Sequence, residues 1–374
     1  MSTAAWASGR TAETAGAGTF RNGVSMKPLQ APGFTEEELA QLLTDLLALK
    51  KSQIREFLAR TGSARTGTKE RIRDRIEEAL RDGELTAAEI VQFLDEVVPW
   101  GKQHVFLYKG PSSPITNWRN TDWVRTLLKQ RRLGNLLNAM LPLALPEAMK
   151  LSSILHDGNR LRVTAIKKRE WWERNAEYDE SKVTREGEPV ELRAFVHRVT
   201  RGLVAFEWDL NANTAFLQIS QLPTGVRYEA VAEEFFKLVD GWLDGSRFRI
   251  VDLRPPIQKL HELEEAGNGE TRSHGINYRS LQGRKLEGRS ASPADPLLGE
   301  AVIDAALAAV RKSGVGHLGN FYWLPNSVAN PVTNPLDAEV HVIVVGWRNR
   351  VNFPTPNGEQ TTRYVLSRIR SHSR

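Results

Sequence analysis

The sequence predicts an α+β fold in which a small all-helical module precedes a larger domain of mixed antiparallel strands and helices. Leucines at helical spacing and two Thr-x-x-Glu capping boxes predict the helical module over residues 34–99. From residue 100 onward, short strands bounded by turn residues alternate with single helices, which is typical of α+β domains. This second region spans 100–374, and a division into subdomains 100–266 and 267–374 is left open.

Residues 1–33 are predicted to form a disordered leader. They are small, polar and rich in glycine, and they show no helical or strand periodicity. Such a segment lacks the apolar surface needed to offset the entropy lost on ordering. A transit peptide and a later translation start at Met26 are two other interpretations. A secretory signal is not predicted, because no continuous apolar core is present.

Four helices are expected in the helical module. Thr35 caps the first, with Glu38 three residues later, and Thr86 caps the fourth in the same way. The other boundaries are less marked, but apolar residues recur at helical spacing throughout. The second helix is expected at 51–60, the third at 68–81 and the fourth from 86 to about 98.

In the larger domain the spacing of apolar residues changes several times between every second residue, which is typical of strands, and helical spacing. A polar surface loop is expected at 178–190, and a turn at Arg201-Gly202 separates two strands. Strands are expected at 104–110, 159–173, 191–200, 202–209, 213–220, 247–253, 317–324, 339–347 and 349–354. Helices are expected at 121–140 (one or two), 228–243, 255–266, 296–314 and 359–372, with a strand or a long loop at 267–295. Strands followed by a helix occur at 191–243 and again at 338–372, so an internal duplication is considered.

Positive charge is concentrated on particular segments. The formal net charge of the chain is +6 and the pI is about 9.5. By our count the net charge is +4 over 50–82, +9 over 101–175 and +5 over 345–374, but −6 over 176–268. This uneven distribution is typical of proteins that bind nucleic acid, although the same basic segments could bind acidic proteins.

The stretch from Leu49 to Leu80 combines a helix–turn–helix pattern with cations. Gly62 can adopt the left-handed conformation that ends a helix, Gly67 allows a sharp turn, and Thr68 can cap the next helix. Ile72, Ile76 and Leu80 recur every four residues and must face the preceding helix. Basic side chains therefore surround a helix start, where unpaired amides and the helix dipole already favour anions. We expect a phosphate site there.

This stretch resembles the SAP family of DNA-binding motifs over about 35 residues. The resemblance rests on Leu49-Lys50, an apolar helix, Gly62, a short linker, Gly67-x-Lys69 and the later Ile72 and Arg75-Ile76. It implies a helix–turn–helix unit that binds the DNA backbone. The sequence departs from the family at Ser63, where a leucine is usual. The residues implied or expected to contact DNA are Arg65, Gly67, Thr68, Lys69, Arg71 and Arg75. The order of a helical region, a WGKQHVFLYK link and a mixed domain also resembles the centromere protein N family.

Two further stretches are candidate DNA contacts. The segment 160–174 places cations around two adjacent tryptophans, a composition that suits a groove for nucleic acid. Adjacent strand residues point to opposite faces, so one tryptophan is expected in the core. The segment 273–290 is rich in glycine and arginine, and a mobile loop is an equal interpretation. The residues selected are Arg160, Arg162, Lys167, Lys168, Arg169, Trp171 and Trp172 in the first segment, and Arg284 and Lys285 in the second.

Signatures of catalysis and of metal binding are weak. The chain has no cysteine, which excludes disulfides and thiolate metal sites. Asp209 and Asp252, each at a strand end, are the candidate carboxylates of a nuclease. His261 and Glu265 share a helix face and could bind a metal, but a surface helix with ion pairs is the preferred interpretation. No cofactor, no metal and no catalytic residue are predicted.

The sequence therefore predicts a non-catalytic DNA-binding protein that contacts the phosphate backbone with low sequence specificity. A role in DNA maintenance, repair or defence against foreign DNA would fit, and duplex DNA is preferred to single strands. The alternatives are a metal-dependent nuclease and a scaffold subunit that binds acidic proteins through the α+β domain. A cytoplasmic location, associated with the nucleoid in a bacterium, is expected, and no membrane partner is predicted.

Overall fold

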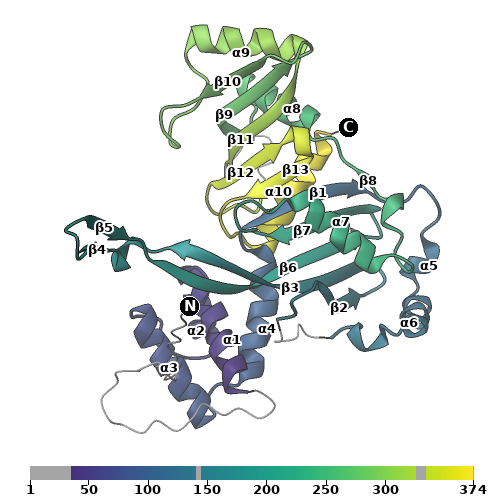
Figure 1. Cartoon of the computed structure of the whole chain (residues 1–374). Coiled ribbons are helices and arrows are strands. Elements are labelled where there is room, and N and C mark those ends of the chain that lie inside the picture. The colour runs from purple at the N-terminus through teal and green to yellow at the C-terminus, as the bar shows by residue number, and fades with distance from the viewer. Residues whose placement is uncertain (1–34, 140–144, 326–333, 374) are drawn as a thin grey trace, which may run out of the picture.

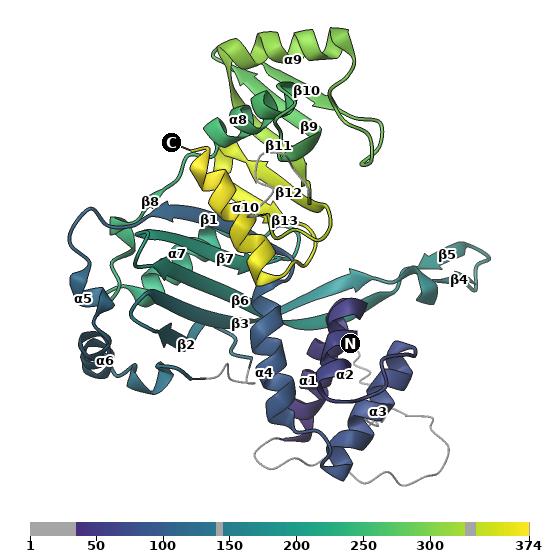
Figure 2. The same ribbon diagram turned by 180° about the vertical axis from the view of Figure 1, so that it is seen from behind.

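The computed structural model describes residues 35–139, 145–325 and 334–373 (Figure 1). The predicted leader, 1–33, lies outside the described residues. The chain forms a bundle of helices at one end and a large twisted sheet with helices on both faces. In the views of Figures 1 and 2 the helical bundle lies below the sheet, and a two-stranded arm projects beside it. The fold is therefore a mixed α+β structure, as the sequence predicted.

The four predicted helices of the N-terminal module are present. They are α1 (Glu36–Ala48), α2 (Lys51–Arg60), α3 (Lys69–Asp82) and α4 (Ala87–Val97). Both capping boxes are confirmed, with Thr35 at α1 and Thr86 at α4. The predicted apolar stripe of α3 is also confirmed, since its three members are at most 6% exposed. The core of the module includes Leu39, Leu42, Leu43, Leu46, Ile54, Phe57, Leu58, Ile72, Ile76, Leu80, Ile90 and Leu94.

The helical module is joined to the sheet by a short link that is packed against the sheet. Helix α4 continues into the 3-10 turn η1 (Val98–Trp100), and β1 (Gln103–Lys109) follows. Trp100 is buried among residues of the sheet and of the last helix, and its carbonyl accepts a hydrogen bond from the Asn357 amide at 3.0 Å. The ring also lies under two guanidinium groups, those of Arg162 and Arg363, each about 5 Å from its centroid. Trp100 is thus the anchor of the link.

One sheet of eleven strands runs through the larger domain. Its order is β10-β9-β11-β12-β13-β1-β7-β6-β3-β2, with β8 paired to β1. All strand pairings among the described residues are antiparallel, apart from one isolated bridge. The remaining strands of this sheet are β2 (Lys150–His156), β3 (Arg160–Arg174), β6 (Phe195–Asp209), β7 (Thr214–Ser220), β8 (Arg249–Ile250), β9 (Thr271–Ser280), β10 (Lys285–Arg289), β11 (Gly314–Trp323), β12 (Val340–Val345) and β13 (Arg350–Phe353).

Alternate residues of the central strand β1 serve two different cores. Val105 and Leu107 belong to one apolar cluster, whereas Phe106 and Tyr108 belong to the other. Since successive strand residues point to opposite faces, the two clusters lie on opposite sides of the sheet. The first cluster is covered by α8 (Arg254–Glu265), α9 (Ala301–Ser313) and α10 (Glu359–Ser371). The second is covered by α5 (Thr116–Arg119), α6 (Thr121–Gln130) and α7 (Tyr228–Val239).

The predicted turn at Arg201-Gly202 is wrong. Residues 195–209 form one strand, β6, that pairs with β3 along its whole length, and Gly202 lies opposite Lys167. The glycine is needed for packing rather than for a turn, because a Cβ there would lie 2.2 Å from Nε of Arg169. The sequence alone does not show that an arginine side chain crosses this position.

The predicted surface loop at 178–190 is also wrong in part. It contains the short turn η3 (Ala176–Tyr178) and a hairpin of β4 (Glu180–Val183) and β5 (Pro189–Leu192). All eight strand residues of the hairpin are exposed, so no apolar pattern marks them in the sequence. The hairpin extends the free ends of β3 and β6. We call residues 167–202 the β-arm, and Figures 1 and 2 show it projecting from the sheet past α2 and α3.

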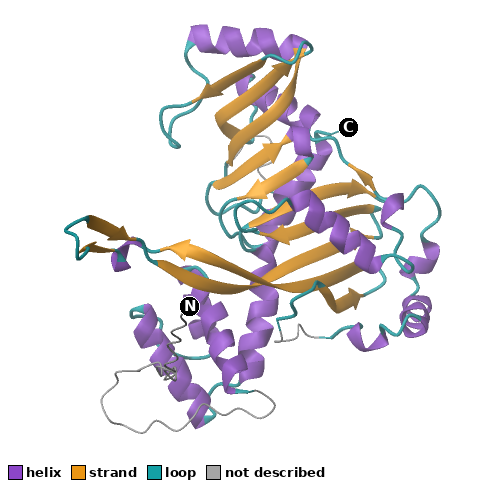
Figure 3. Ribbon diagram, in the orientation of Figure 1, coloured by secondary structure: helices purple, strands orange, loops and turns teal. Residues whose placement is uncertain are grey.

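Other differences are smaller. Strand β2 was not predicted, and the strand expected at 247–253 is reduced to two residues. The region 267–295, expected to be a strand or a long loop, holds the two strands β9 and β10, and Figure 3 shows the resulting hairpin beside α9. The short 3-10 turns are η2 (Gly134–Leu136), η4 (Gly245–Arg247) and η5 (Gly346–Arg348).

The two stretches considered as a duplication both contribute antiparallel strands followed by a helix, β6-β7-α7 and β12-β13-α10. Their helices cover opposite faces, and their strands belong to one continuous sheet that is joined where β13 pairs with β1.

Candidate nucleic-acid interface

The linker between α2 and α3 has the backbone that the sequence predicted. Gly62 ends α2 with φ of 71°, in the left-handed region. Gly67 has φ of 136°, which side-chain-bearing residues rarely adopt. Thr68 caps α3 by accepting a hydrogen bond from the Arg71 amide at 3.4 Å. The linker is therefore a defined turn that places residues 63–68 at the start of α3.

Arg75 holds this linker from inside. Its Nη1 donates to the Ala64 carbonyl at 2.8 Å, its Nη2 donates to the Thr66 carbonyl, and its Nε donates to the Arg71 carbonyl at 3.2 Å. A Cβ on Gly67 would lie 3.0 Å from Nη2 of the same side chain. The structure thus gives Arg75 a positioning role in the linker, beside the DNA contact that the resemblance implies.

Three predicted cations lie on the surface beside the start of α3. Arg65, Lys69 and Arg71 are exposed, and among the described residues none of them has a carboxylate within ion-pair distance. Lys69 Nζ donates to the Leu47 carbonyl at 2.6 Å, near the end of α1. Arg65 and Arg71 extend from the linker and from the first turn. These two guanidinium groups are the free charges of the predicted site.

The behaviour of Glu70 indicates that this helix start favours anions. The pKa of its carboxyl is lowered, first by a hydrogen bond from its own backbone amide and then by one from the Thr68 side chain. The amides at the first turn of a helix stabilise negative charge in this way. The Glu70 and Arg71 amides are already bonded, to the Glu70 carboxyl and to the Thr68 hydroxyl, so a phosphate would meet the positive end of the helix dipole together with Arg65 and Arg71.

Exposed cations that the candidate set omitted lie on neighbouring elements. Lys51 and Arg55 are exposed on α2 and Lys102 is exposed in front of β1. Lys102 lies close enough to Lys50 to lower the pKa of its ammonium, after the larger effect of burial. An unpaired cation on the outer face of a predicted helix is the signal that could have found Lys51 and Arg55.

The cations of 160–174 are mostly paired with carboxylates. Arg162 is 9% exposed and meets Glu207 at 3.3 Å, and Lys167 meets Glu234 of α7 at 3.1 Å. Lys168 lies 3.0 Å from Glu147 and also contacts Glu170, and Arg160 lies 3.6 Å from Glu359. Arg169 crosses over Gly202 and donates to the Ser220 carbonyl at 3.1 Å. These side chains hold the sheet and its neighbours together, so the excess charge of this segment is largely neutralised.

The two tryptophans of this segment lie on the β-arm. Trp171 is half-buried and opposite Arg198, and Trp172 is 67% exposed and packs on the ring of His197 with a 5.0 Å centroid separation. Neither belongs to an apolar core cluster of the described residues. The expectation that one tryptophan is in the core is therefore wrong, because β3 leaves the sheet before it reaches them.

Arg284 and Lys285 lie far from the helical module. They belong to the turn and first residue of the β9–β10 hairpin, beside α9, at the opposite end of the molecule in both Figure 1 and Figure 2. Lys285 pairs with Glu287 at 2.7 Å, and Arg284 is exposed. The structure does not bring this pair together with the α2–α3 linker.

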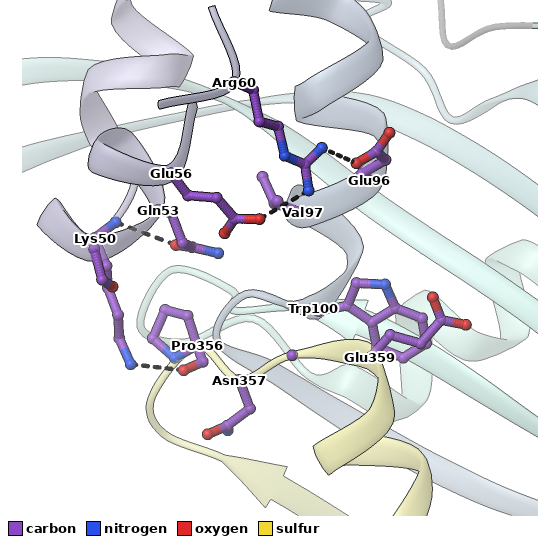
Figure 4. A pocket seen from close by; sticks show the side chains of 12 residues that line it. Lys50, Gln53, Glu56, Arg60, Glu96, Val97, Trp100, Pro356, Asn357 and Glu359 are labelled. Atoms are coloured by element: carbon purple, nitrogen blue, oxygen red, sulfur yellow. Dashed lines mark hydrogen bonds and ion pairs between the residues drawn. The ribbon is translucent and has the colours of Figure 1, made fainter. Parts of the chain in front are cut away.

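A cleft of 560 Å³ separates α2 from the loop before α10 (Figure 4). Arg60 on its wall is paired with Glu56 at 2.8 Å and with Glu96 at 2.6 Å. Lys50 closes one end by donating to the Pro356 carbonyl at 2.6 Å, and Glu359 lies at the other side. With three carboxylates and two cations in its lining, the cleft does not suit a polyanion.

The candidate catalytic and metal residues have structural roles. Asp209 accepts hydrogen bonds from the amides of the turn that follows it, and Asp252 is paired with Arg254 at 2.8 Å. His261 is buried with Nδ1 2.8 Å from the hydroxyl oxygen of Tyr278, while Glu265 pairs with Arg311 at 2.5 Å. In the part of the chain that the structure describes, no three histidine, aspartate or glutamate side chains are grouped to hold a metal.

A comparison with models of known protein families finds no match, and neither does a comparison with curated protein sequences. Among the described residues, no helix has the length and apolar character needed to cross a membrane. The candidate interface therefore rests on the geometry of the α2–α3 linker.

Proposed function

We propose that the protein binds DNA without catalysis, through the phosphate backbone, at the α2–α3 linker and the first turn of α3. The observation that carries this proposal is the pair of exposed guanidinium groups without a carboxylate partner, Arg65 and Arg71, beside a helix start whose Glu70 amide and Thr68 side chain stabilise the Glu70 carboxylate. Backbone contacts of this kind give affinity with little sequence discrimination. A role in DNA maintenance, repair or defence remains part of the proposal.

The proposed interface does not include the cations at 160–174, because most of them are already paired with carboxylates. A lysine or arginine that already has a carboxylate partner gains less from a phosphate, because the existing ion pair must be given up. We therefore place duplex DNA against α2 and α3, with Lys69, Lys51 and Arg55 as further contacts. The β-arm passes on the same side of the molecule (Figures 1 and 2), but its outer part, residues 170–198, has a net charge of −3 by our count.

The test measures the salt dependence of duplex binding by the full-length protein. Each phosphate neutralised adds about −0.9 to the slope of log K against log salt. The double variant Arg65→Gln/Arg71→Gln is expected to bind at least ten-fold more weakly at low salt, with a slope shallower by about 1.8. Fluorescence anisotropy with a labelled duplex over a series of salt concentrations gives both quantities.

The matched control is Lys129→Gln/Arg131→Gln, which removes two exposed cations at the end of α6. It has the same change in net charge and is expected to keep both affinity and slope close to those of the parent. Equal losses in the two double variants would show a general charge effect, and an unchanged linker variant would refute the proposed interface.

A protein partner is a second candidate function, favoured by the β-arm. Six large hydrophobic side chains are exposed on 172–195, on both faces of the ribbon, and apolar side chains exposed together in this way are typical of a protein contact. They are Trp172, Tyr178, Val183, Val190, Leu192 and Phe195. Co-purification of a protein that survives nuclease treatment, and that is lost when Trp172 is changed to Ser, would support this candidate.

A further inference from the structure

A second cavity lies in the larger domain, beneath the last turn of α10. It lies at the edge of the sheet where β1 ends and where β7 and β8 begin. Its volume is 370 Å³. None of the residues that line it is acidic. Three cations and three hydroxyl groups contribute to the lining, from Lys109, Arg249, Arg370, Ser112, Thr214 and Ser373. A cavity with this composition suits an anion.

Strand pairing brings the key side chains to one face. Lys109 is the last residue of β1 and lies opposite both Thr214 of β7 and Arg249 of β8. Residues directly opposite on antiparallel strands share a face and have Cβ atoms about 5 Å apart. It is the face of Val105 and Leu107, which α10 covers. Lys109, Thr214 and Arg249 therefore surround one point at the end of the sheet.

The loop that closes the cavity is held in place. The Gly110 amide donates to the Asn213 carbonyl at 2.9 Å, and Nδ2 of Asn213 donates to the Pro111 carbonyl at 2.9 Å. Nη2 of Arg249 donates to the Ser112 hydroxyl at 3.0 Å. A Cβ on Gly110 would lie 1.9 Å from Oδ1 of Asn213, so only glycine fits here. The backbone of this loop and the Arg249 guanidinium are therefore positioned before any ligand binds.

The surroundings of Arg370 are the second observation that points to an anion. Its guanidinium donates to the carbonyls of Tyr108 at 2.7 Å and Ala215 at 3.0 Å, and burial lowers its pKa to about 10. Among the described residues no carboxylate lies within ion-pair distance of Arg370, Lys109 or Arg249, and Asp209 attracts Arg370 only from farther away. The neighbouring helix residues Arg363 and Arg368 pair instead with Glu207 and Glu270.

We propose that this cavity binds the phosphate group of a small phosphorylated molecule, at a site separate from the DNA interface. A phosphate dianion offers several acceptor oxygens, which can meet the Lys109 ammonium, the planar Arg249 guanidinium and the adjacent hydroxyls together. It also supplies the negative charge that Arg370 lacks. The site does not depend on DNA binding by the helical module.

The test uses inorganic phosphate and pyrophosphate as probes, titrated into the full-length protein by calorimetry at constant ionic strength. The parent is expected to show saturable binding. The variant Lys109→Gln/Arg249→Gln is expected to bind at least ten-fold more weakly while unfolding at the same temperature as the parent. The variant Lys129→Gln/Arg131→Gln, with the same charge change elsewhere, is expected to bind phosphate like the parent.

Two arms separate this site from the DNA interface. The linker variant Arg65→Gln/Arg71→Gln is expected to keep its phosphate affinity, and a short duplex is expected not to displace phosphate. Displacement by the duplex would assign the cavity to the DNA surface and overturn the separate site. The absence of saturable binding, or equal affinity in the parent and the Lys109→Gln/Arg249→Gln variant, would overturn the phosphate site itself.

Discussion

At the residue scale, buried arginines organise much of this protein. Glu207 is 1% exposed and forms ion pairs with two arginines, Arg162 at 3.3 Å and Arg363 at 2.5 Å. Both guanidinium groups also face the ring of Trp100, which anchors the link between the helical module and the sheet. A single carboxylate therefore supports the packing of β3, β6, α10 and the link.

Glu207→Gln should destabilise the protein strongly. Removing one partner of a buried ion pair leaves uncompensated charge, at about 3–5 kcal/mol. Chemical denaturation monitored by tryptophan fluorescence measures the loss in the free energy of unfolding. The control Glu359→Gln removes a half-exposed partner of Arg363 and should lose less than about 1 kcal/mol. Similar losses in the two variants would contradict the central role of Glu207.

The two linker glycines allow a second comparison at this scale. Gly67→Ala places a Cβ 3.0 Å from Nη2 of Arg75 at φ of 136°, whereas Gly62→Ala meets nothing within 4 Å at φ of 71°. A backbone strained in this way costs about 1–3 kcal/mol. We expect Gly67→Ala to lower the unfolding temperature more than Gly62→Ala, and also to weaken DNA binding. The reverse order would show that the turn tolerates a side chain at residue 67.

At the scale of elements, the β-arm differs from every other part of the sheet. Beyond Lys167 and Gly202 the strands β3 and β6 pair only with each other, because β2 and β7 end earlier. Between 170 and 198 we count eight acidic and five basic residues, for a net charge of −3. The arm is therefore held by cross-strand pairs such as Arg198–Glu173 at 2.6 Å rather than by a core.

Replacing residues 180–192 by a short Gly-Gly turn should leave the fold intact. The strand residues of this hairpin are all exposed, so its removal should change the free energy of unfolding by no more than ~0.5 kcal/mol. Thermal unfolding and circular dichroism of the shortened protein measure this. A large loss of stability would mean that the hairpin packs against the body of the protein.

At the scale of the whole molecule, buried neutral histidines link stability to pH. Burial lowers the pKa of His261 from 6.5 to about 4, with a smaller contribution from Arg311, and lowers that of His104 to about 3. Between pH 6.5 and pH 4 the unfolded chain therefore binds protons that the folded chain does not. Stability should be complete above pH 6.5 and should fall as the pH is lowered through this window.

For His261 alone the loss should be on the order of 2–3 kcal/mol, since one pKa unit corresponds to about 1.4 kcal/mol. Urea denaturation at pH 7 and at pH 4.5 should show this fall in the parent. His261→Gln should be less stable than the parent at pH 7 but should lose less on acidification. An equal fall in both proteins would assign the pH dependence to other groups.

The sequence by itself determined the parts whose geometry is local. Capping residues, apolar spacing and the two linker glycines predicted α1 to α4 and the turn before α3, because helices and tight turns are set by residues close in the chain. Arg65, Lys69 and Arg71 lie at that helix start as expected. Most later helices, from α7 to α10, were also found, since each combines an amphipathic stripe with a clear beginning or end.

Only the tertiary structure decided which distant groups meet. Gly202 was expected in a turn but lies within β6, where the Arg169 side chain crosses it, and the cations of 160–174 were candidate DNA contacts but mostly face carboxylates. The cavity of Lys109, Arg249 and Arg370 joins three segments that are far apart in sequence. Strand pairing and ion pairing depend on partners that can lie more than a hundred residues away, so no local pattern records them. The sequence thus determines where charge is, and the fold determines which charges remain free.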